Sequence, residues 1–172
     1  MLPETRIRTA LISVYHKERI DEIAHLLNNF GIRILSTGGT FDFIKNLGID
    51  VTAVDSLTSY PAILGGRVKT LHPKIFGGIL YRREVESDLQ EIEKYDIPPI
   101  DLVIVDLYPF ENTVASTTDE AEIIEKIDIG GISLIRAAAK NFNDVLIVAS
   151  ANQYDSLITL MEEKKGCSDI AD

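Results

Sequence analysis

A cluster of basic side chains stands in the middle of the chain, within the segment LGGRVKTLHP at residues 64–73. Arg67, Lys69 and His72 fall within six positions of one another, between a pair of glycines and a proline. A guanidinium binds a phosphate or carboxylate through two parallel hydrogen bonds, whereas an ammonium supplies a compact charge whose pKa responds to its surroundings. The cluster therefore predicts a site for a small anion. A solvated basic loop without a ligand is the alternative, and His72 taken alone is more typical of a structural role.

The segment STGGT at residues 36–40 indicates a second place for an anion. It follows a short apolar run and precedes an amphipathic stretch, so it is predicted to join a strand to a helix. Small residues let the backbone approach a ligand, and the unpaired N–H groups of a helix N-terminus favour a phosphate. An ordinary glycine turn with a threonine cap is the other interpretation of so short a motif.

An acid and a phenol end the most apolar run of the sequence, in VDLYPF at residues 105–110. Asp106 and Tyr108 are of types that exchange protons, although Tyr108 alone is more typical of a core aromatic. Further along, Asp128 precedes a glycine pair, and Lys140 follows three alanines in RAAAKN. A lysine on a helix is exposed by default, but the small residues before Lys140 favour close packing there.

These segments must be positioned by the elements between them, and the apolar periodicity predicts an alternation of strands and helices. Strands are expected over residues 7–14, 32–36, 50–54, 101–107 and 145–149. Helices are expected over residues 17–30, 40–47, 84–95, about 117–126, 130–141 and 152–164. Thr117 and Glu120 have the spacing of a capping box for the fourth helix. Residues 55–83, which contain the basic cluster, are predicted to be irregular.

This alternation predicts an α/β fold with three layers. We expect a Rossmann-like, five-stranded, mainly parallel sheet with helices on both faces. In such sheets ligands bind at the carboxyl ends of the strands, which is where the four segments above are expected to meet. The loop after the first strand, with Tyr15, His16 and Lys17, joins them at the same edge.

The composition of the chain limits the classes of protein to which it can belong. The chain has 172 residues, of which 45% are apolar and 26% charged, the usage of a globular domain. We expect one domain over residues 1–165 and a tail over residues 166–172. The formal net charge of −10 disfavours nucleic acid and anionic membranes as partners, because both are bound through basic faces. A single cysteine, Cys167, and the lack of a long apolar stretch predict a cytoplasmic protein without an internal disulfide or membrane span.

The segments GGRVKTLHP, LYPF and DIGG followed by RAAAKN, in this order, resemble the IMP cyclohydrolase domain of the bifunctional purine enzymes whose other domain is an AICAR transformylase. The resemblance runs from about Thr9 to Ser150. STGGT is shared more widely, with the methylglyoxal-synthase-like fold. The resemblance implies cyclisation of 5-formamidoimidazole-4-carboxamide ribotide (FAICAR) to inosine monophosphate (IMP) with loss of water. It also implies no metal and no other cofactor, a homodimer, and an AICAR transformylase domain or protein as a partner.

The resemblance also implies which residues act. The four that match catalytic positions are Lys69, Tyr108, Asp128 and Lys140. The resemblance lets us assign Tyr108 and Asp128 to orienting and deprotonating the carboxamide nitrogen, and the two lysines to stabilising the oxyanion and protonating the departing hydroxyl. Those that match substrate-binding positions are Tyr15, His16, Lys17, Thr37, Gly38, Gly39, Thr40, Arg67, Val68, Lys69, Thr70, Val105, Asp106, Asp128 and Ile129.

The chain departs from the family pattern at two places. The first binding segment commonly reads SVSDK but has Tyr15 and His16 here, and NLYPF is replaced by a segment beginning with Asp106. These 172 residues contain no transformylase domain, which fits either a stand-alone cyclohydrolase or part of a longer enzyme. Two other functions are considered, methylglyoxal synthase and a regulatory module that binds a nucleotide without turnover. The segments KTLHP and RAAAKN argue against the first, and the four catalytic candidates argue against the second.

Overall fold

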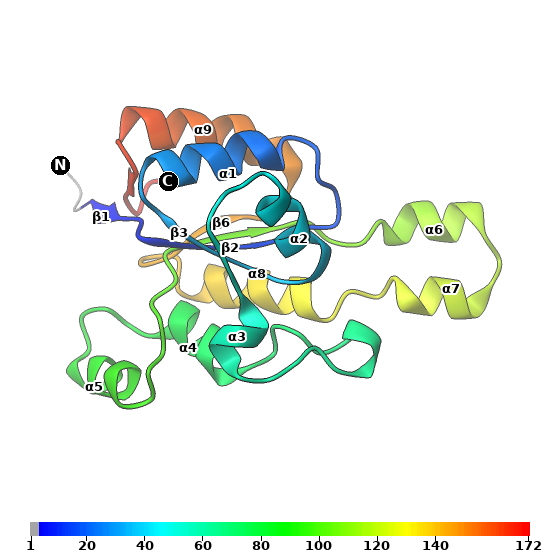
Figure 1. The fold of residues 1–172 in the computed structure, drawn as a ribbon, viewed down its shortest axis with the longest axis horizontal. Coiled ribbons are helices and arrows are strands. Elements are labelled where there is room, and N and C mark those ends of the chain that lie inside the picture. Colours follow the sequence, from blue (N-terminus) through cyan, green and yellow to red (C-terminus); the bar gives the residue numbers. More distant parts are fainter. Residues whose placement is uncertain (1–3) are drawn as a thin grey trace.

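The computed structural model describes residues 4–172 and centres on a parallel sheet (Figure 1). Residues 1–3, the start of the predicted domain, lie outside the described residues. Five strands pair in the order β4-β3-β2-β5-β6, and each pairing is parallel. The bounds are β2 (Thr9–Ser13), β3 (Arg33–Ser36), β4 (Val51–Ala53), β5 (Leu102–Val105) and β6 (Leu146–Val148). The predicted α/β fold with a five-stranded sheet is confirmed.

The two central strands are buried on both faces, which explains why their sequences are continuously apolar. Ala10 and Ile12 of β2 point into one core cluster, whereas Leu11 between them points into the other. Strand β5 alternates in the same way along LVIV, and all four of its residues are buried. A parallel sheet covered by helices on both faces requires this pattern, because successive side chains leave opposite faces of a strand.

Helices form the two outer layers (Figure 1). One face of the sheet is covered by α1 (Ile20–Asn29), α2 (Gly38–Asn46) and α9 (Tyr154–Glu163). The other face is covered by α3 (Val54–Thr58), α4 (Pro73–Leu80) and α8 (Gly130–Lys140), with α5 (Glu86–Lys94) beside α4. Among residues 4–172, no helix combines the length and the apolar character needed to cross a membrane.

The segment predicted to be irregular, residues 55–83, contains the helix α4. Proline occupies the first turn, and the ring Nδ1 of His72 accepts a hydrogen bond from the backbone N–H of Lys74 at 3.1 Å. The helix was not predicted because its sequence, PKIFGGIL, contains two glycines, which have a low helix propensity. Gly78 is required there by packing, because a Cβ on it would lie 2.3 Å from the carbonyl oxygen of Pro98. The same segment also contains α3 and the short 3-10 helix η1 (Leu64–Gly66).

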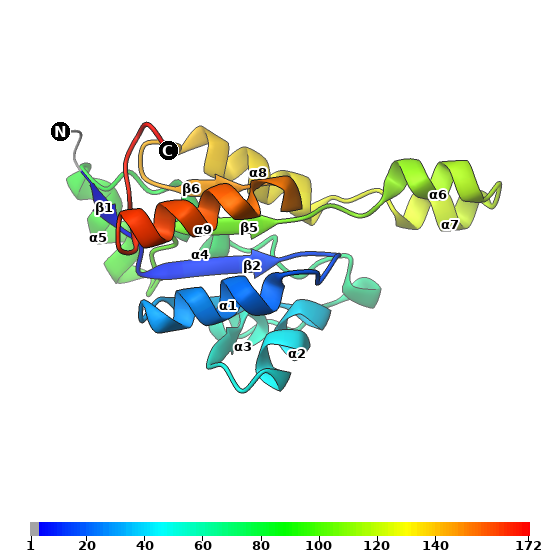
Figure 2. The same cartoon turned by 90° about the horizontal axis from the view of Figure 1, so that it is seen from above.

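Two short helices, α6 (Phe110–Ser116) and α7 (Glu120–Glu125), form a hairpin that projects from the body of the molecule (Figure 2). No helix was predicted over α6. The capping box predicted from Thr117 and Glu120 is wrong, because Asp119 is the N-cap of α7 and accepts from the N–H groups of Ala121 and Glu122. The helix predicted from residue 17 also begins later, at Ile20.

The ends of the described chain lie together. Strand β1 (Thr5–Arg6) pairs antiparallel with β7 (Cys167–Ser168), which falls within the predicted tail. The ammonium of Lys164 binds the carboxylates of Asp169 and Asp172 at 2.8 and 2.7 Å. The predicted tail is thus held to the rest of the domain by strand pairing and ion pairs. A second 3-10 helix, η2 (Ala151–Gln153), leads into α9.

The phenol of Tyr154 makes the stability of the fold sensitive to alkaline pH. Tyr154 is 2% exposed, and burial raises its pKa to about 12, helped by the carboxylates of Asp106 and Glu18. The folded pKa lies above the unfolded value of 10.0, so this contribution to stability is complete below pH 10 and lost as the pH rises toward 12. We expect Tyr154→Phe to flatten the alkaline fall in the free energy of unfolding, measured with urea between pH 8 and about 11.5. Tyr95→Phe, at an exposed position, should keep the wild-type slope, and an unchanged slope in Tyr154→Phe would contradict the assignment.

Candidate active site

A pocket of about 610 Å³ opens at the carboxyl edge of β2, β3 and β5. Its lining comes from segments that are far apart in the sequence: the loop after β2, the start of α2, the loop after η1, the loop after β5, and the chain between α7 and α8. The carboxyl ends of neighbouring parallel strands meet at one edge, and helix N-termini face the same edge. The topology therefore brings the predicted segments together at the expected place.

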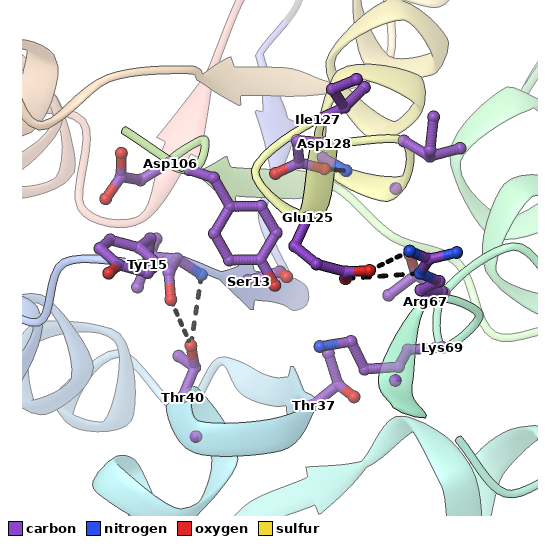
Figure 3. Close-up of a pocket in the computed structure, with 18 of the residues that line it drawn as sticks. Ser13, Tyr15, Thr37, Thr40, Arg67, Lys69, Asp106, Glu125, Ile127 and Asp128 are labelled. Atoms are coloured by element: carbon purple, nitrogen blue, oxygen red, sulfur yellow. Dashed lines mark hydrogen bonds and ion pairs between the residues drawn. The ribbon is translucent and has the colours of Figure 1, made fainter. Parts of the chain in front are cut away.

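Lys69 meets the N-terminus of α2 inside this pocket. Its Nζ atom lies 3.6 Å from the position that a Cβ on Gly38 would take, and its side chain passes over Gly66. Figure 3 shows the ammonium directed toward Thr37, the N-cap of α2. No hydrogen-bond acceptor for this ammonium is found among the described residues. The cation and the unpaired N–H groups of the helix are thus both available to the anionic groups of a ligand.

Lys17 and Thr40 shape the neighbouring loop. The Thr40 hydroxyl donates to the carbonyl of Val14 at 2.9 Å and accepts from its N–H at 3.2 Å, which ties α2 to the end of β2. The Lys17 ammonium donates to the carbonyls of Val14 and Tyr15. Burial lowers the pKa of Lys17, and the charge of Lys69 adds to that effect. Both lysines line the pocket.

Tyr108 and Asp128 line the same pocket and interact electrostatically. Burial raises the pKa of the Tyr108 phenol, and the carboxylate of Asp128 raises it further. The phenol is therefore protonated at neutral pH and able to donate a hydrogen bond to a ligand. One oxygen of Asp128, Oδ1, accepts from the N–H of Gly131 at 2.6 Å. A Cβ on Gly131 would lie 2.7 Å from Cδ2 of Leu107 and 2.8 Å from the other oxygen, Oδ2, so a larger residue here would displace the Asp128 or Leu107 side chain.

The helical hairpin contributes Glu125 to the lining of the pocket and Lys126 beside it, neither of which the sequence analysis identified. Glu125 of α7 pairs with the guanidinium of Arg67, and both side chains are more than half exposed (Figure 3). The ammonium of Lys126 lies 5.4 Å from the ring centroid of Tyr15 and 5.7 Å from that of Tyr108. Nothing in the polar pattern of α7 distinguishes these two residues from an ordinary solvated face. Only the tertiary structure places Glu125 in the pocket lining and Lys126 over the rings of Tyr15 and Tyr108.

Comparison with known proteins identifies a family and several relatives for this chain. Residues 19–133 match the family model described as the MGS-like domain. The chain belongs to the MGS-like domain family. It is 65% identical over 170 residues to the bifunctional purine biosynthesis protein PurH of Bacteroides thetaiotaomicron, which covers 99% of this chain and 34% of that protein. The PurH protein of Aquifex aeolicus is 51% identical over 157 residues, covering 91% of this chain and 31% of that protein.

The chain thus spans about a third of the length of the curated relatives it matches. Among solved structures, the crystal structure of ForH matches with a TM-score of 0.80 and 38% sequence identity, covering 92% of this chain and 80% of that chain. The resemblance to part of the bifunctional purine enzymes, stated from the motifs alone, is confirmed.

Most of the predicted site residues of this MGS-like domain line the pocket. Those that do are Tyr15, Lys17, Thr37, Gly39, Thr40, Arg67, Lys69, Thr70, Asp106, Tyr108, Asp128 and Ile129. Four predicted binding residues adjoin the pocket without lining it. Val105 is buried within β5, Val68 bridges to Ile63, Gly38 starts α2, and the side chain of His16 binds Asp106.

Lys140 is not brought to the pocket of this MGS-like domain, which differs from the expectation. It is exposed at the last position of α8, whereas Gly130 at the first position lines the pocket. A helix of 11 residues is about 15 Å long, so one helix separates the two. Its neighbour Asn141 is buried and donates to the carbonyls of Ile79 and Tyr81, so part of RAAAKN is structural.

No group of three metal-ligating side chains occurs within the described chain, residues 4–172. The pocket instead offers two lysine cations, an arginine, a helix N-terminus, a phenol and a carboxylate. That set is suited to binding an anionic ligand and transferring protons within it.

Proposed function

We propose that this MGS-like domain is an IMP cyclohydrolase, which closes the second ring of FAICAR to give IMP in the last step of de novo purine biosynthesis. One observation carries the proposal: an anion site at the start of α2 shares one pocket with Lys69, Tyr108 and Asp128. A ribotide has a phosphate at one end and a reactive base at the other, which fits these two parts. The names of the curated relatives, which are purine biosynthesis proteins, support a purine ribotide as the substrate.

The proposed reaction is an intramolecular condensation. The carboxamide nitrogen attacks the formyl carbon, an N–C bond forms, and the formyl oxygen takes up negative charge. One proton from the carboxamide nitrogen and one from the formamide nitrogen leave with that oxygen as water. Because both reacting groups belong to one molecule, the protein mainly has to hold the reactive rotamer and transfer protons.

Each pocket residue has a proposed part in these steps. The phosphate is held by the N-terminus of α2 with Lys17 and Arg67, and the Lys69 ammonium stabilises the oxyanion. Tyr108 is protonated at neutral pH, so it orients the carboxamide by donating a hydrogen bond. Asp128 is the base that accepts the proton. The role proposed for Lys140 from the family resemblance has no place in the pocket of its own chain.

The proposal extends to partners. A homodimer remains a prediction from the family resemblance. The relatives are bifunctional and about three times as long as the matched region, which supports an AICAR transformylase domain or protein as the source of the formylated substrate. That partner activity would attach the formyl group that ring closure consumes.

A direct assay tests the proposed function. The metal-stripped protein is mixed with FAICAR, and ultraviolet absorbance follows purine formation against a protein-free blank. Conversion by the protein supports the cyclohydrolase. Binding of IMP in calorimetry without conversion of FAICAR would favour the regulatory module, and conversion of a triose phosphate to methylglyoxal would favour the synthase.

The pair of Arg67 and Glu125 predicts that the hairpin competes with the ligand for the guanidinium. We expect Glu125→Gln to lower the Kd for IMP by about 2- to 5-fold, the equivalent of one exposed ion pair. Calorimetric titration at low salt measures the change. Glu122→Gln on the same helix is the control and should keep the wild-type Kd. An unchanged or higher Kd in Glu125→Gln would show that Arg67 does not hold the phosphate.

A further inference from the structure

The loop after β2 and the loop after β5 are tied together by His16 and Asp106, beside the pocket. The Oδ2 atom of Asp106 accepts from the backbone N–H of His16 at 2.8 Å and contacts its ring Nδ1 at 2.6 Å. An ionised carboxylate only accepts, so Nδ1 carries a proton in this contact. The N–H of Asp106 donates to the carbonyl of Ser13 at 3.4 Å. The tie thus extends the β2–β5 pairing beyond its last register pair, Ser13 and Val105.

Tyr15 and Tyr108 form a second link between the same two loops. Their rings meet edge to face with centroids 5.3 Å apart, and the Tyr15 ring meets the His16 ring at 4.9 Å. Tyr15 and Tyr108 are 41% and 37% exposed, so a packed core does not hold these rings in place. Local contacts must therefore hold the two rings in position. The tie between His16 and Asp106 joins the backbones of the two loops that carry them.

The side chain of His16 is used by this tie and not by the pocket. Tyr15 and Lys17, on either side of it, line the pocket, whereas His16 does not. Figure 3 shows the carboxylate of Asp106 turned away from Lys69 and Thr37, at the side of the pocket where Tyr15 lies. The two departures from the family pattern, at residues 15–16 and at residue 106, are therefore in direct contact.

We infer that His16 is a positioning residue whose ring hydrogen bond to Asp106 holds Tyr15 against Tyr108 and so fixes the direction of the Tyr108 phenol. Its effect on turnover rests on the proposed function, in which that phenol orients the carboxamide. The tie itself is independent of the reaction. Loss of the ring hydrogen bond is expected to leave the anion site intact, because the Lys17 ammonium is held by the carbonyls of Val14 and Tyr15 and not by the His16 ring.

His16 is a cleaner position for the test than Asp106. The Asp106 carboxylate also raises the pKa of Lys17 against the lowering caused by burial, so removing it changes the anion site as well. His16→Leu removes the ring donor and keeps the backbone bond. His16→Asn keeps an N–H donor, because the amide nitrogen of Asn is as many bonds from Cβ as Nδ1 of His. His25→Leu, exposed on α1, is the matched control.

Steady-state kinetics of ring closure give the first readout. We expect kcat of His16→Leu to fall about 10-fold with KM within about twofold, since transition-state orientation is lost and ground-state binding is kept. His16→Asn should recover most of kcat, and His25→Leu should match the wild type. A wild-type kcat in His16→Leu, or an equal loss in the Leu and Asn variants, overturns the inference.

NMR gives a readout that does not need turnover. The ring resonances of Tyr108, assigned by their absence in Tyr108→Phe, should move in His16→Leu and return toward the wild-type positions in His16→Asn. Both variants lose the aromatic ring of histidine, so only the hydrogen bond distinguishes them. If the wild type fails to convert FAICAR, the proposed function fails while this comparison still decides the positioning role. Unmoved Tyr108 resonances in His16→Leu overturn that role.

Discussion

Lys69→Ala is expected to lower kcat/KM for ring closure by about 10³-fold, the usual cost of losing one group that stabilises an oxyanion. The ammonium lies at the start of α2, close to Gly38, and no acceptor among the described residues neutralises it. Its whole charge is therefore available to the ligand. Initial rates from ultraviolet absorbance measure the loss, and calorimetry with IMP separates its share in binding.

Lys74→Ala is the matched control for this lysine. Lys74 lies on α4 outside the pocket, and its ammonium pairs with Asp96 at 3.2 Å on the surface. That variant should keep wild-type kinetics. A loss smaller than about 10-fold in Lys69→Ala would contradict a role in stabilising transition-state charge. An effect on the Kd of IMP with unchanged kcat would restrict Lys69 to holding the phosphate.

Asp101→Ala is expected to lower the free energy of unfolding by about 3 kcal/mol, because it leaves the largely buried guanidinium of Arg83 without its partner. Asp101 is 5% exposed just before β5, and its Oδ2 accepts from the N–H groups of Arg8 and Thr9 at 2.8 and 2.9 Å. Its Oδ1 accepts from Arg83, whose guanidinium stacks on the ring of Tyr81. One carboxylate thus anchors three segments at the amino ends of the strands. This is the edge of the sheet opposite to the one at which the pocket opens.

Urea unfolding followed by circular dichroism measures this loss. Asp101→Asn keeps an oxygen acceptor without the charge, so its loss should fall between those of the wild type and Asp101→Ala. Asp155→Ala breaks an ion pair with Arg19 in which the aspartate is 83% exposed, and should cost less than about 1 kcal/mol. A loss below about 1 kcal/mol in Asp101→Ala would mean that the buried anchor contributes no more than a surface pair.

The architecture could be predicted because burial of strands and helices requires apolar residues in a pattern that is visible within each short segment. The run DLVIVDL has to be a strand covered on both faces, and Ile20, Ile23 and Leu27 recur at helical spacing on α1. The helix α4 could not be predicted from its own sequence. Gly78 is present because it packs closely against the carbonyl of Pro98, and glycine lowers the helix propensity of the segment. The helix α6 was likewise hidden within a segment that resembles a turn.

The residues of the candidate site also fall into those that the sequence could predict and those that it could not. STGGT and the basic cluster could be predicted because glycine conformations and clustered charges are local features. The pairing of Arg67 with Glu125 could not, because those residues are far apart in sequence and meet only through the hairpin. The contact between His16 and Asp106 also depends on β2 and β5 being neighbours in the sheet.

The amino-acid sequence by itself determined the layers, the edge of the sheet at which the pocket opens, and the residue types that gather there, because hydrophobic periodicity and turn chemistry act over a few residues. Only the tertiary structure decided which of those residues share one pocket. It separated Lys140 from Asp128 by the length of α8 and used His16 to hold a neighbouring loop. Strand order and helix direction set these distances, and neither can be read from any single segment.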